Sequence, residues 1–134
     1  MAIQMSAALR NARLDAITTI LGNGALIEIF TGAQPANVAA ADSGTKLATL
    51  TGGTPFAAGA ASGVLTLSAI TGDSSADASG TAAHYRLKTS GGTCHEQGTV
   101  TATGGGGDMT FTSVAFVASE PITMTSWTKT EPGA

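Results

Sequence analysis

Charged residues are scarce in this chain. Six Lys and Arg and nine Asp and Glu stand among 134 residues, about half the usual share of charge. The net charge is −3, and the scattered cations form no basic stripe that could follow a phosphate backbone, so we expect no direct nucleic-acid binding. With only two histidines besides, the chain holds little material for acid–base catalysis.

Cysteine and long apolar runs are also lacking. Cys94 is the only cysteine, so no disulfide can form within the chain, and a metal site made of its cysteines alone is excluded. No stretch approaches the roughly 18 apolar residues of a membrane span. Arg10, Arg13 and Asp15 interrupt the N-terminal segment, which therefore does not read as a signal peptide. We expect a protein that is neither exported by that route nor bound to a membrane.

Small residues dominate what is present. Ala, Thr, Gly and Ser occupy 75 of the 134 positions, while 31 large apolar residues are spread along the chain. A packed core is therefore possible but thin, because each small side chain buries little area. Trp127, Tyr85 and four phenylalanines are too few for an aromatic platform that stacks sugars or bases.

The N-terminal segment predicts one amphipathic helix. Ser6 can cap a helix that runs to about Leu21, and the glycines of residues 22–24 supply a left-handed stop. Two apolar rows recur along it at steps of three and four residues: Met5, Leu9, Ala12, Ala16 and Ile20 in one, and Leu14, Ile17 and Leu21 in the other. Because both rows are apolar, we expect the helix to contact more than one surface.

The remainder of the chain predicts a mainly β domain. Seven or eight short strands are indicated, over residues 25–31, 46–51, 64–70, 81–89, 94–101, 109–112, 114–117 and 122–129. This spacing is typical of an antiparallel β-sandwich or jelly roll. We therefore divide one domain into a helix and its stop (1–24), a sandwich (25–130) and a free C-terminal end (131–134).

Residues 81–89 show the clearest half-buried alternation. One face carries Ala83, Tyr85 and Leu87, and the opposite, mainly polar face carries Ala82, His84, Arg86 and Lys88. Gly91 and Gly92 then offer a tight turn, so this strand and residues 94–101 should form an antiparallel hairpin. Residues 32–45, by contrast, predict a loop that is long for so compact a domain.

Three residues on this hairpin could carry chemistry. His84, Cys94 and His95 could hold a metal ion or form a Cys–His nucleophile pair. Against this, Cys94 and His95 are neighbours on a strand and point to opposite faces, and no second ligand motif accompanies them. We expect an inward cysteine and two surface histidines, and no catalytic, cofactor-binding or metal-binding residue.

Two loops invite comparison with known ligand motifs. Asp73 and Asp77 flank a turn rich in Ser and Ala, but a calcium loop needs a denser series of acidic positions, so Asx-type turns are expected. Residues 104–107 are four glycines followed by Asp108, without the Lys-Ser or Lys-Thr pair of a phosphate loop. They predict a connection between strands.

Several stretches resemble small structural proteins of tailed bacteriophages. They are residues 1–17, residues 27–32 (Ile-Glu-Ile-Phe-Thr-Gly), residues 65–78 and residues 81–87, so the likeness spans most of the chain. The resemblance implies a virion building block, assembled in the cytoplasm of a bacterial host, and carries no functional residue that can be transferred position by position.

The resemblance and the composition together lead to one functional expectation. It is a non-enzymatic head decoration or cement protein that binds the major capsid protein or other virion proteins and associates with itself as a symmetric oligomer such as a trimer. The N-terminal helix or the long loops would grip the neighbours. A tail or neck component, a receptor- or glycan-binding module at a tail tip, and an enzyme built on His84, Cys94 and His95 are the alternatives.

Overall fold

The computed structural model describes residues 3–133 and contains one helix, α1, over Ala7–Leu21. The Ser6 hydroxyl accepts a hydrogen bond from the Leu9 amide at 3.2 Å, and the helix ends at Gly22, whose φ of +69° favours glycine. The predicted helix and both of its ends are therefore confirmed. Its apolar rows face in different directions: Leu14 and Leu21 are buried, whereas Leu9 and Ile20 are exposed.

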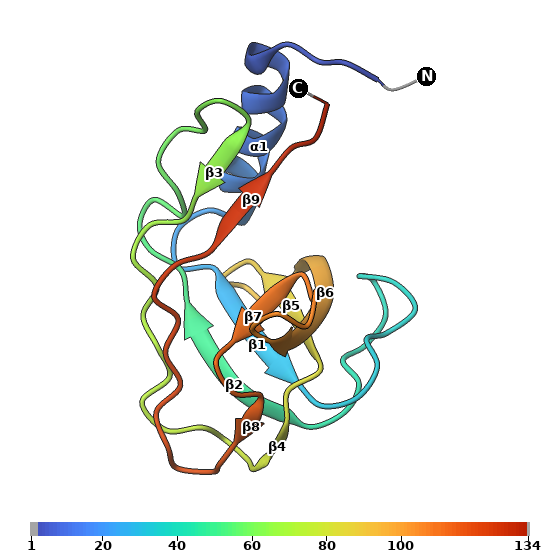
Figure 1. Ribbon diagram of the computed structural model, residues 1–134. Helices are drawn as coiled ribbons and strands as arrows, with labels where there is room; N and C mark the ends of the chain where they lie inside the picture. Colours follow the sequence, from blue (N-terminus) through green and yellow to red (C-terminus); the bar gives the residue numbers. More distant parts are fainter. Residues whose placement is uncertain (1–2, 134) are drawn as a thin grey trace.

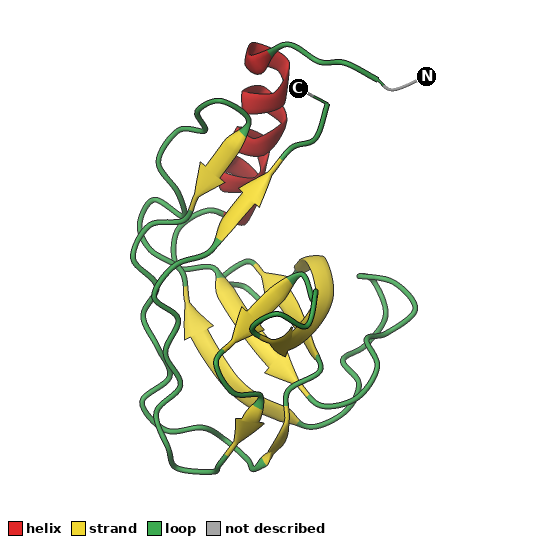
Figure 2. Ribbon diagram, in the orientation of Figure 1, coloured by secondary structure: helices red, strands yellow, loops and turns green. Residues whose placement is uncertain are grey.

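Most of the β-structure lies in one five-stranded mixed sheet that curls on itself (Figures 1 and 2). Its strands are β1 (Leu26–Phe30), β2 (Lys46–Thr51), β5 (His84–Lys88), β6 (Cys94–Ala102) and β7 (Met109–Phe111). The order is β2-β1-β5-β6-β7, and every pair is antiparallel except β6 and β7. The predicted hairpin of β5 and β6 is confirmed, and β1 lies inside the sheet with a strand paired on either side.

Two short ribbons complete the fold. The strand β3 (Val64–Thr66) pairs with β9 (Thr128–Thr130), and β4 (Gly80–Thr81) pairs with β8 (Ala115–Phe116). The first ribbon lies beside α1 at one end of the molecule, and the second lies at the other end (Figure 1). The mainly β class with one helix is thus confirmed, and the sheet is a curled mixed one.

Some predicted strands are shorter than their patterns indicated. Residues 122–127 are almost entirely irregular, although their side chains alternate. Before β9 begins, the backbone pairs here through an isolated bridge between Ile122 and Asp73 and one hydrogen bond from the Leu67 amide to the Trp127 carbonyl. Alternation reports which side chains are buried, and Ile122, Met124 and Trp127 are indeed buried without a continuous ladder of backbone hydrogen bonds.

The predicted free C-terminal end is wrong for residues 131–133. The Glu131 carboxylate forms an ion pair with Arg13 at 2.9 Å, its amide donates to the Gly63 carbonyl, and the Gly133 carbonyl accepts a hydrogen bond from the Met5 amide at 2.7 Å. The sequence could not show these contacts because they join residues that lie far apart along the chain. Residue 134 lies outside the described residues.

Candidate functional site

The three predicted site residues do not come together. His84 pairs across the hairpin with Thr99, and Cys94 pairs with Lys88, so His84 and Cys94 lie at opposite ends of the β5–β6 ladder. His95 is exposed and Cys94 is half-buried. Within residues 3–133, no group of three potential metal-ligating side chains is close enough to hold an ion.

His84 contradicts the expectation of a surface histidine. Its side chain is buried, with 1 % of the residue exposed, and the ring stacks on Phe30 with centroids 5.2 Å apart. Nδ1 lies 2.8 Å from the Gly32 carbonyl oxygen. This contact ties β5 to the first residue of the long loop, so the histidine holds the loop instead of meeting solvent.

Arg86 is the centre of a polar cluster on the same face of the sheet. Its guanidinium is 1 % exposed and donates to the carbonyls of Val38 at 2.7 Å and Ala40 at 2.9 Å, and to Oδ1 of Asp42 at 2.8 Å. Nε donates to the Cys94 sulfur at 3.3 Å. The guanidinium therefore binds the loop at three points spread over five residues.

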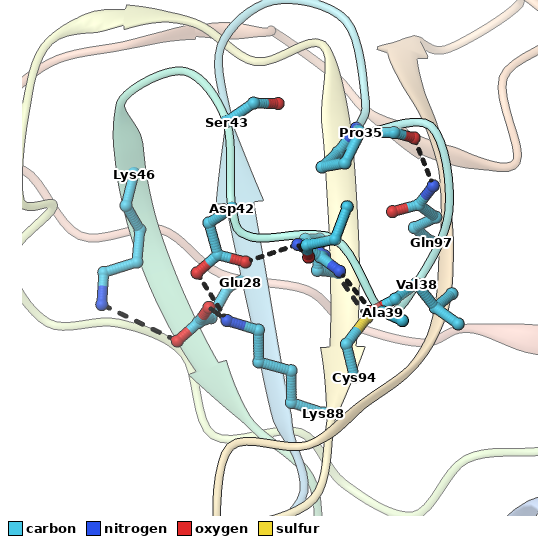
Figure 3. Close-up of polar contacts among 12 residues, drawn as sticks. Glu28, Pro35, Val38, Ala39, Asp42, Ser43, Lys46, Lys88, Cys94 and Gln97 are labelled. Atoms are coloured by element: carbon cyan, nitrogen blue, oxygen red, sulfur yellow. Dashed lines mark hydrogen bonds and ion pairs between the residues drawn. The ribbon is translucent and has the colours of Figure 1, made fainter.

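Lys88 continues the cluster toward the edge of the sheet. Its ammonium lies 2.5 Å from Glu28 on β1 and 2.8 Å from Asp42, and Lys46 on β2 adds a longer pair to Glu28 at 3.7 Å (Figure 3). Burial alone would raise the pKa of Asp42, but hydrogen bonds and charge from Lys88 and Arg86 outweigh it and leave that pKa below its ordinary value. Burial alone would lower the pKa of Lys88, but its bonds to Asp42 and Glu28 hold it above its ordinary value.

We call this cluster the loop clamp: Glu28, Asp42, His84, Arg86, Lys88 and Gln97. Gln97 on β6 contributes an amide that donates to the Pro35 carbonyl at 2.7 Å, a contact that Figure 3 shows beside the ion pairs. The clamp fastens residues 32–45 over the polar face of β1, β5 and β6. The half-buried pattern predicted for this strand is therefore wrong, because the loop covers the polar face and all of His84–Lys88 is buried.

A second polar cluster lies in a cleft of about 400 Å³ between α1, the other face of the sheet and β9. The Tyr85 hydroxyl donates to Oε1 of Glu96 at 2.6 Å, and the Lys129 ammonium pairs with the same oxygen. That ammonium also lies 4.0 Å from the centroid of the Trp127 ring, which meets Tyr85 edge-on. Burial, and then the Glu96 carboxylate, raises the pKa of the Tyr85 phenol well above its ordinary value.

In both clusters the polar groups bind one another and so fasten segments of the chain. A phenol with a raised pKa stays protonated and acts as a donor, and the Glu96 carboxylate that it binds is already shared with Lys129. In the clamp, Asp42 and Lys88 likewise satisfy one another. Each cluster joins a regular strand to an irregular or terminal segment across a long stretch of sequence.

The two loops compared with ligand motifs also serve the fold. Asp73 accepts the Ser75 amide at 3.0 Å, as expected for an Asx turn, and its other oxygen accepts the Thr49 amide of β2 at 2.9 Å. The glycines of residues 104–107 do connect two strands. A Cβ at Gly105 would lie 2.8 Å from the Thr101 side chain, so glycine is required where the chain turns back beside β6.

Sequence reasoning missed the partners of the loop clamp. Glu28, the single charged residue in an otherwise apolar strand, was the available signal, because a carboxylate in a central strand needs a cation on the neighbouring strand. Lys88 on β5 and Lys46 on β2 supply that charge, and Asp42 enters only through the fold of the loop.

Comparison with known proteins places no further restriction on the function. No family model, no curated protein and no solved structure matches the chain. No helix in the described part of the chain has both the length and the apolarity needed to cross a bilayer.

Proposed function

We propose that the protein is a non-enzymatic structural component of a tailed-bacteriophage virion, and specifically a head decoration or cement protein that stabilises the capsid shell. The observation that carries the proposal is the internal use of charge. Arg13, Glu28, Asp42, Arg86, Lys88, Glu96, Lys129 and Glu131 all take part in ion pairs within the chain. Arg13 and Asp42 stay partly exposed, but the exposed residues of the described chain are mostly Thr, Ser, Ala and Gly.

Such a surface favours close packing against other proteins. Small, weakly charged side chains desolvate at low cost and lose little conformational entropy when they are covered. Many identical contacts on a particle can then supply the affinity that each contact lacks. The proposed partners are the major capsid protein or other virion proteins and further copies of this chain, and the proposed site of assembly is the host cytoplasm.

The loop clamp supports a binding role for residues 32–45. A loop of this length would ordinarily be mobile, and ordering it on binding would reduce affinity. Here the Arg86 and Lys88 side chains hold it on the sheet before any partner arrives. A preordered loop loses less entropy on binding to a shell.

The architecture belongs to the same proposal. We propose that the curled sheet and the two ribbons pack around one core as a sandwich or jelly roll, the fold predicted from the spacing of the strands. In support, buried residues from β1, β3 and the 122–127 segment all lie in one apolar cluster.

Locating the chain in particles tests the function. Virions from the bacterium that encodes this sequence would be purified, their heads separated from their tails, and its peptides quantified against the major capsid protein. We expect many copies in the head fraction and none in free tails. Enrichment in tails would instead support the tail, neck or tail-tip alternatives, and absence from all particles would contradict a virion role.

A further inference from the structure

Two carboxylates share the Lys88 ammonium in the loop clamp. Nζ lies 2.5 Å from Oε2 of Glu28 and 2.8 Å from Oδ2 of Asp42, and Figure 3 shows both carboxylates converging on it. The side chains of Glu28 and Lys88 are each 10 % exposed, and that of Asp42 is 41 % exposed. Replacing a buried ion pair by apolar residues is often neutral or stabilising. Stability alone therefore does not account for a second carboxylate on this ammonium.

The side chains of this cluster match the groups that an amide bond between a lysine and an aspartate requires. Lys88 offers a nitrogen that lies beside an oxygen bonded directly to Cγ of Asp42, the carbon to be attacked. Glu28 can accept a proton from that nitrogen, because its buried Oε2 meets no other hydrogen-bond donor within residues 3–133. Arg86 donates to the other Asp42 oxygen, Oδ1, at 2.8 Å, where negative charge would gather during the attack.

We propose that Lys88 and Asp42 condense into an amide bond without a separate enzyme, with Glu28 as the proton carrier. A proton first passes from the ammonium to Oδ2, which gives an amine and a carboxylic acid. The amine nitrogen then bonds to Cγ while Glu28 takes a second proton from it, and Arg86 stabilises the oxyanion on Oδ1. Glu28 returns that proton to the Oδ2 hydroxyl, which leaves as water. One ammonium and one carboxylate thus become one amide and one water molecule.

The fold brings the reacting groups together before the reaction starts. Glu28 and Lys88 lie on the paired strands β1 and β5, and Arg86 holds Asp42 in place. Groups held in this way can react as if at an effective concentration of about 10⁵ M, which favours condensation. Ion pairing outweighs burial and holds the pKa of Lys88 above, and the pKa of Asp42 below, its ordinary value, so the pair starts charged and reacts slowly. The freshly folded chain therefore still holds the ion pair, in which Asp42 titrates.

The amide bond would make the loop clamp permanent. It closes a covalent ring between residues 42 and 88, which restricts the unfolded chain as a disulfide does. With Cys94 as the only cysteine, the chain cannot form an internal disulfide, and amide formation needs no oxidant. This inference goes beyond the proposed function and does not depend on it. A chain that carries the bond but is absent from particles, or one that lacks it but is found in heads, would separate the two.

Mass spectrometry of the intact, denatured chain tests the proposal. Samples are taken while freshly folded wild type is incubated at neutral pH, and we expect a growing fraction that has lost the mass of one water molecule. Trypsin digestion locates the bond. It should join residues 14–46 to residues 87–129 in one peptide, because trypsin does not cleave after an amidated Lys88. A succinimide at an aspartate loses the same mass but leaves these peptides separate.

Four variants assign the roles, and circular dichroism checks that each is folded. Glu28→Gln should keep its full mass because it lacks the proton carrier, and Lys88→Arg should keep it because it lacks the nucleophile. Asp42→Asn should lose ammonia instead of water. Lys46→Arg is the matched control, since Lys46 pairs with the same glutamate at 3.7 Å and should leave the reaction unchanged.

Stability gives a second measurement on the same samples. The fraction that carries the bond should unfold at a higher urea concentration than the fraction that does not. A folded wild type that keeps its full mass over weeks of incubation would overturn the proposal. Loss of water that persists in Lys88→Arg, or a joined peptide that forms equally fast in Glu28→Gln, would overturn it as well.

Discussion

The Arg86 guanidinium lies 2.8 Å from the Asp42 carboxylate although 43 residues separate them. Arg86 is held on a central strand of the sheet and Asp42 on an irregular loop, so this pair decides where residues 32–45 lie. Five further contacts repeat the same connection: one each from His84, Lys88 and Gln97, and two from Arg86 itself. The loop is consequently part of the folded domain, and releasing it should lower the free energy of unfolding.

Replacing Arg86 by methionine should be strongly destabilising. The variant leaves the Val38 and Ala40 carbonyls without the donor that they share, and an unsatisfied buried polar group costs about 1–3 kcal/mol. Asp42, whose side chain is 41 % exposed, keeps its bond to Lys88 and adds less. Urea unfolding followed by circular dichroism measures the free energy of unfolding. Lys46→Met is the control, because Lys46 is 42 % exposed in its side chain and its pair with Glu28 is long; a change of about 0–1 kcal/mol is expected. Equal effects from the two variants would contradict a buried clamp.

Stability should fall in acid through Asp42. Its pKa in the folded state lies below its ordinary value of 3.8, so the stabilisation is complete above that value and is lost as the pH falls through the lower folded pKa. Hydrogen bonds from Thr99 lower the pKa of Asp108 in the same direction, so part of the slope belongs to that residue. Urea midpoints between pH 7 and pH 2 should show a shallower acid slope in Asp42→Asn than in the wild type. Identical slopes would refute the role of the Asp42 ion pairs.

Tyr85 should not ionise while the chain is folded. It is the only tyrosine, so absorbance near 295 nm reports it alone. Because burial and Glu96 raise its pKa, we expect the phenolate signal to appear only together with the loss of far-ultraviolet circular dichroism at alkaline pH. Titration at the ordinary tyrosine value of about 10, with the fold intact, would show that the cleft does not hold the phenol.

Removing the Tyr85 hydroxyl should weaken the attachment of β9. Tyr85→Phe loses a hydrogen bond to a carboxylate, which contributes about 2 kcal/mol when partly buried. Trp127, the only tryptophan, touches both Tyr85 and Lys129, so its fluorescence should shift as β9 loosens. Unfolding by urea and the emission maximum together check the prediction, and an unchanged free energy of unfolding would contradict it.

Glycine should be required at the end of the long loop. Gly44 has a φ of +73°, and a Cβ there would lie 2.0 Å from the Thr31 carbonyl oxygen, so Gly44→Ala must displace backbone and should cost more than about 1 kcal/mol. Gly59 is a matched control, since a Cβ there meets no atom within 4 Å. Gly59→Ala should be neutral or slightly stabilising in the same urea experiment. If both substitutions were neutral, residues 31 and 44 would not be in close contact.

Deleting the helix is a poor test of its role in assembly. Leu14 and Leu21 are buried in the same cluster as the sheet residues. Deleting residues 1–22 would therefore uncover the core and also remove the exposed Leu9 and Ile20. Of its two apolar rows, only the one with Leu14 and Leu21 is buried in the described chain, so contact of the helix with more than one surface stays a prediction. Single substitutions of Leu9 or Ile20 separate a role of the helix in assembly from its role in the core.

The amino-acid sequence by itself determined the local features of this protein. The cap at Ser6, the stop at Gly22 and the apolar run of β1 are dictated by propensity and by neighbouring residues, and each was predicted correctly. The same is true of the hairpin of β5 and β6, which a two-glycine turn favours.

Only the tertiary structure decided what covers each face. A period of two shows that His84, Arg86 and Lys88 share one side of β5, but it does not show whether water or another segment lies on that side. Their burial depends on the return of residues 32–45 over the sheet, through hydrogen bonds that span 44 to 52 positions. Such contacts form because a buried cation must find a carboxylate or a carbonyl, wherever in the chain it lies. In the same way, the sequence showed two apolar rows on α1, but only the tertiary structure shows that Leu14 and Leu21 are buried and that Leu9 and Ile20 are exposed.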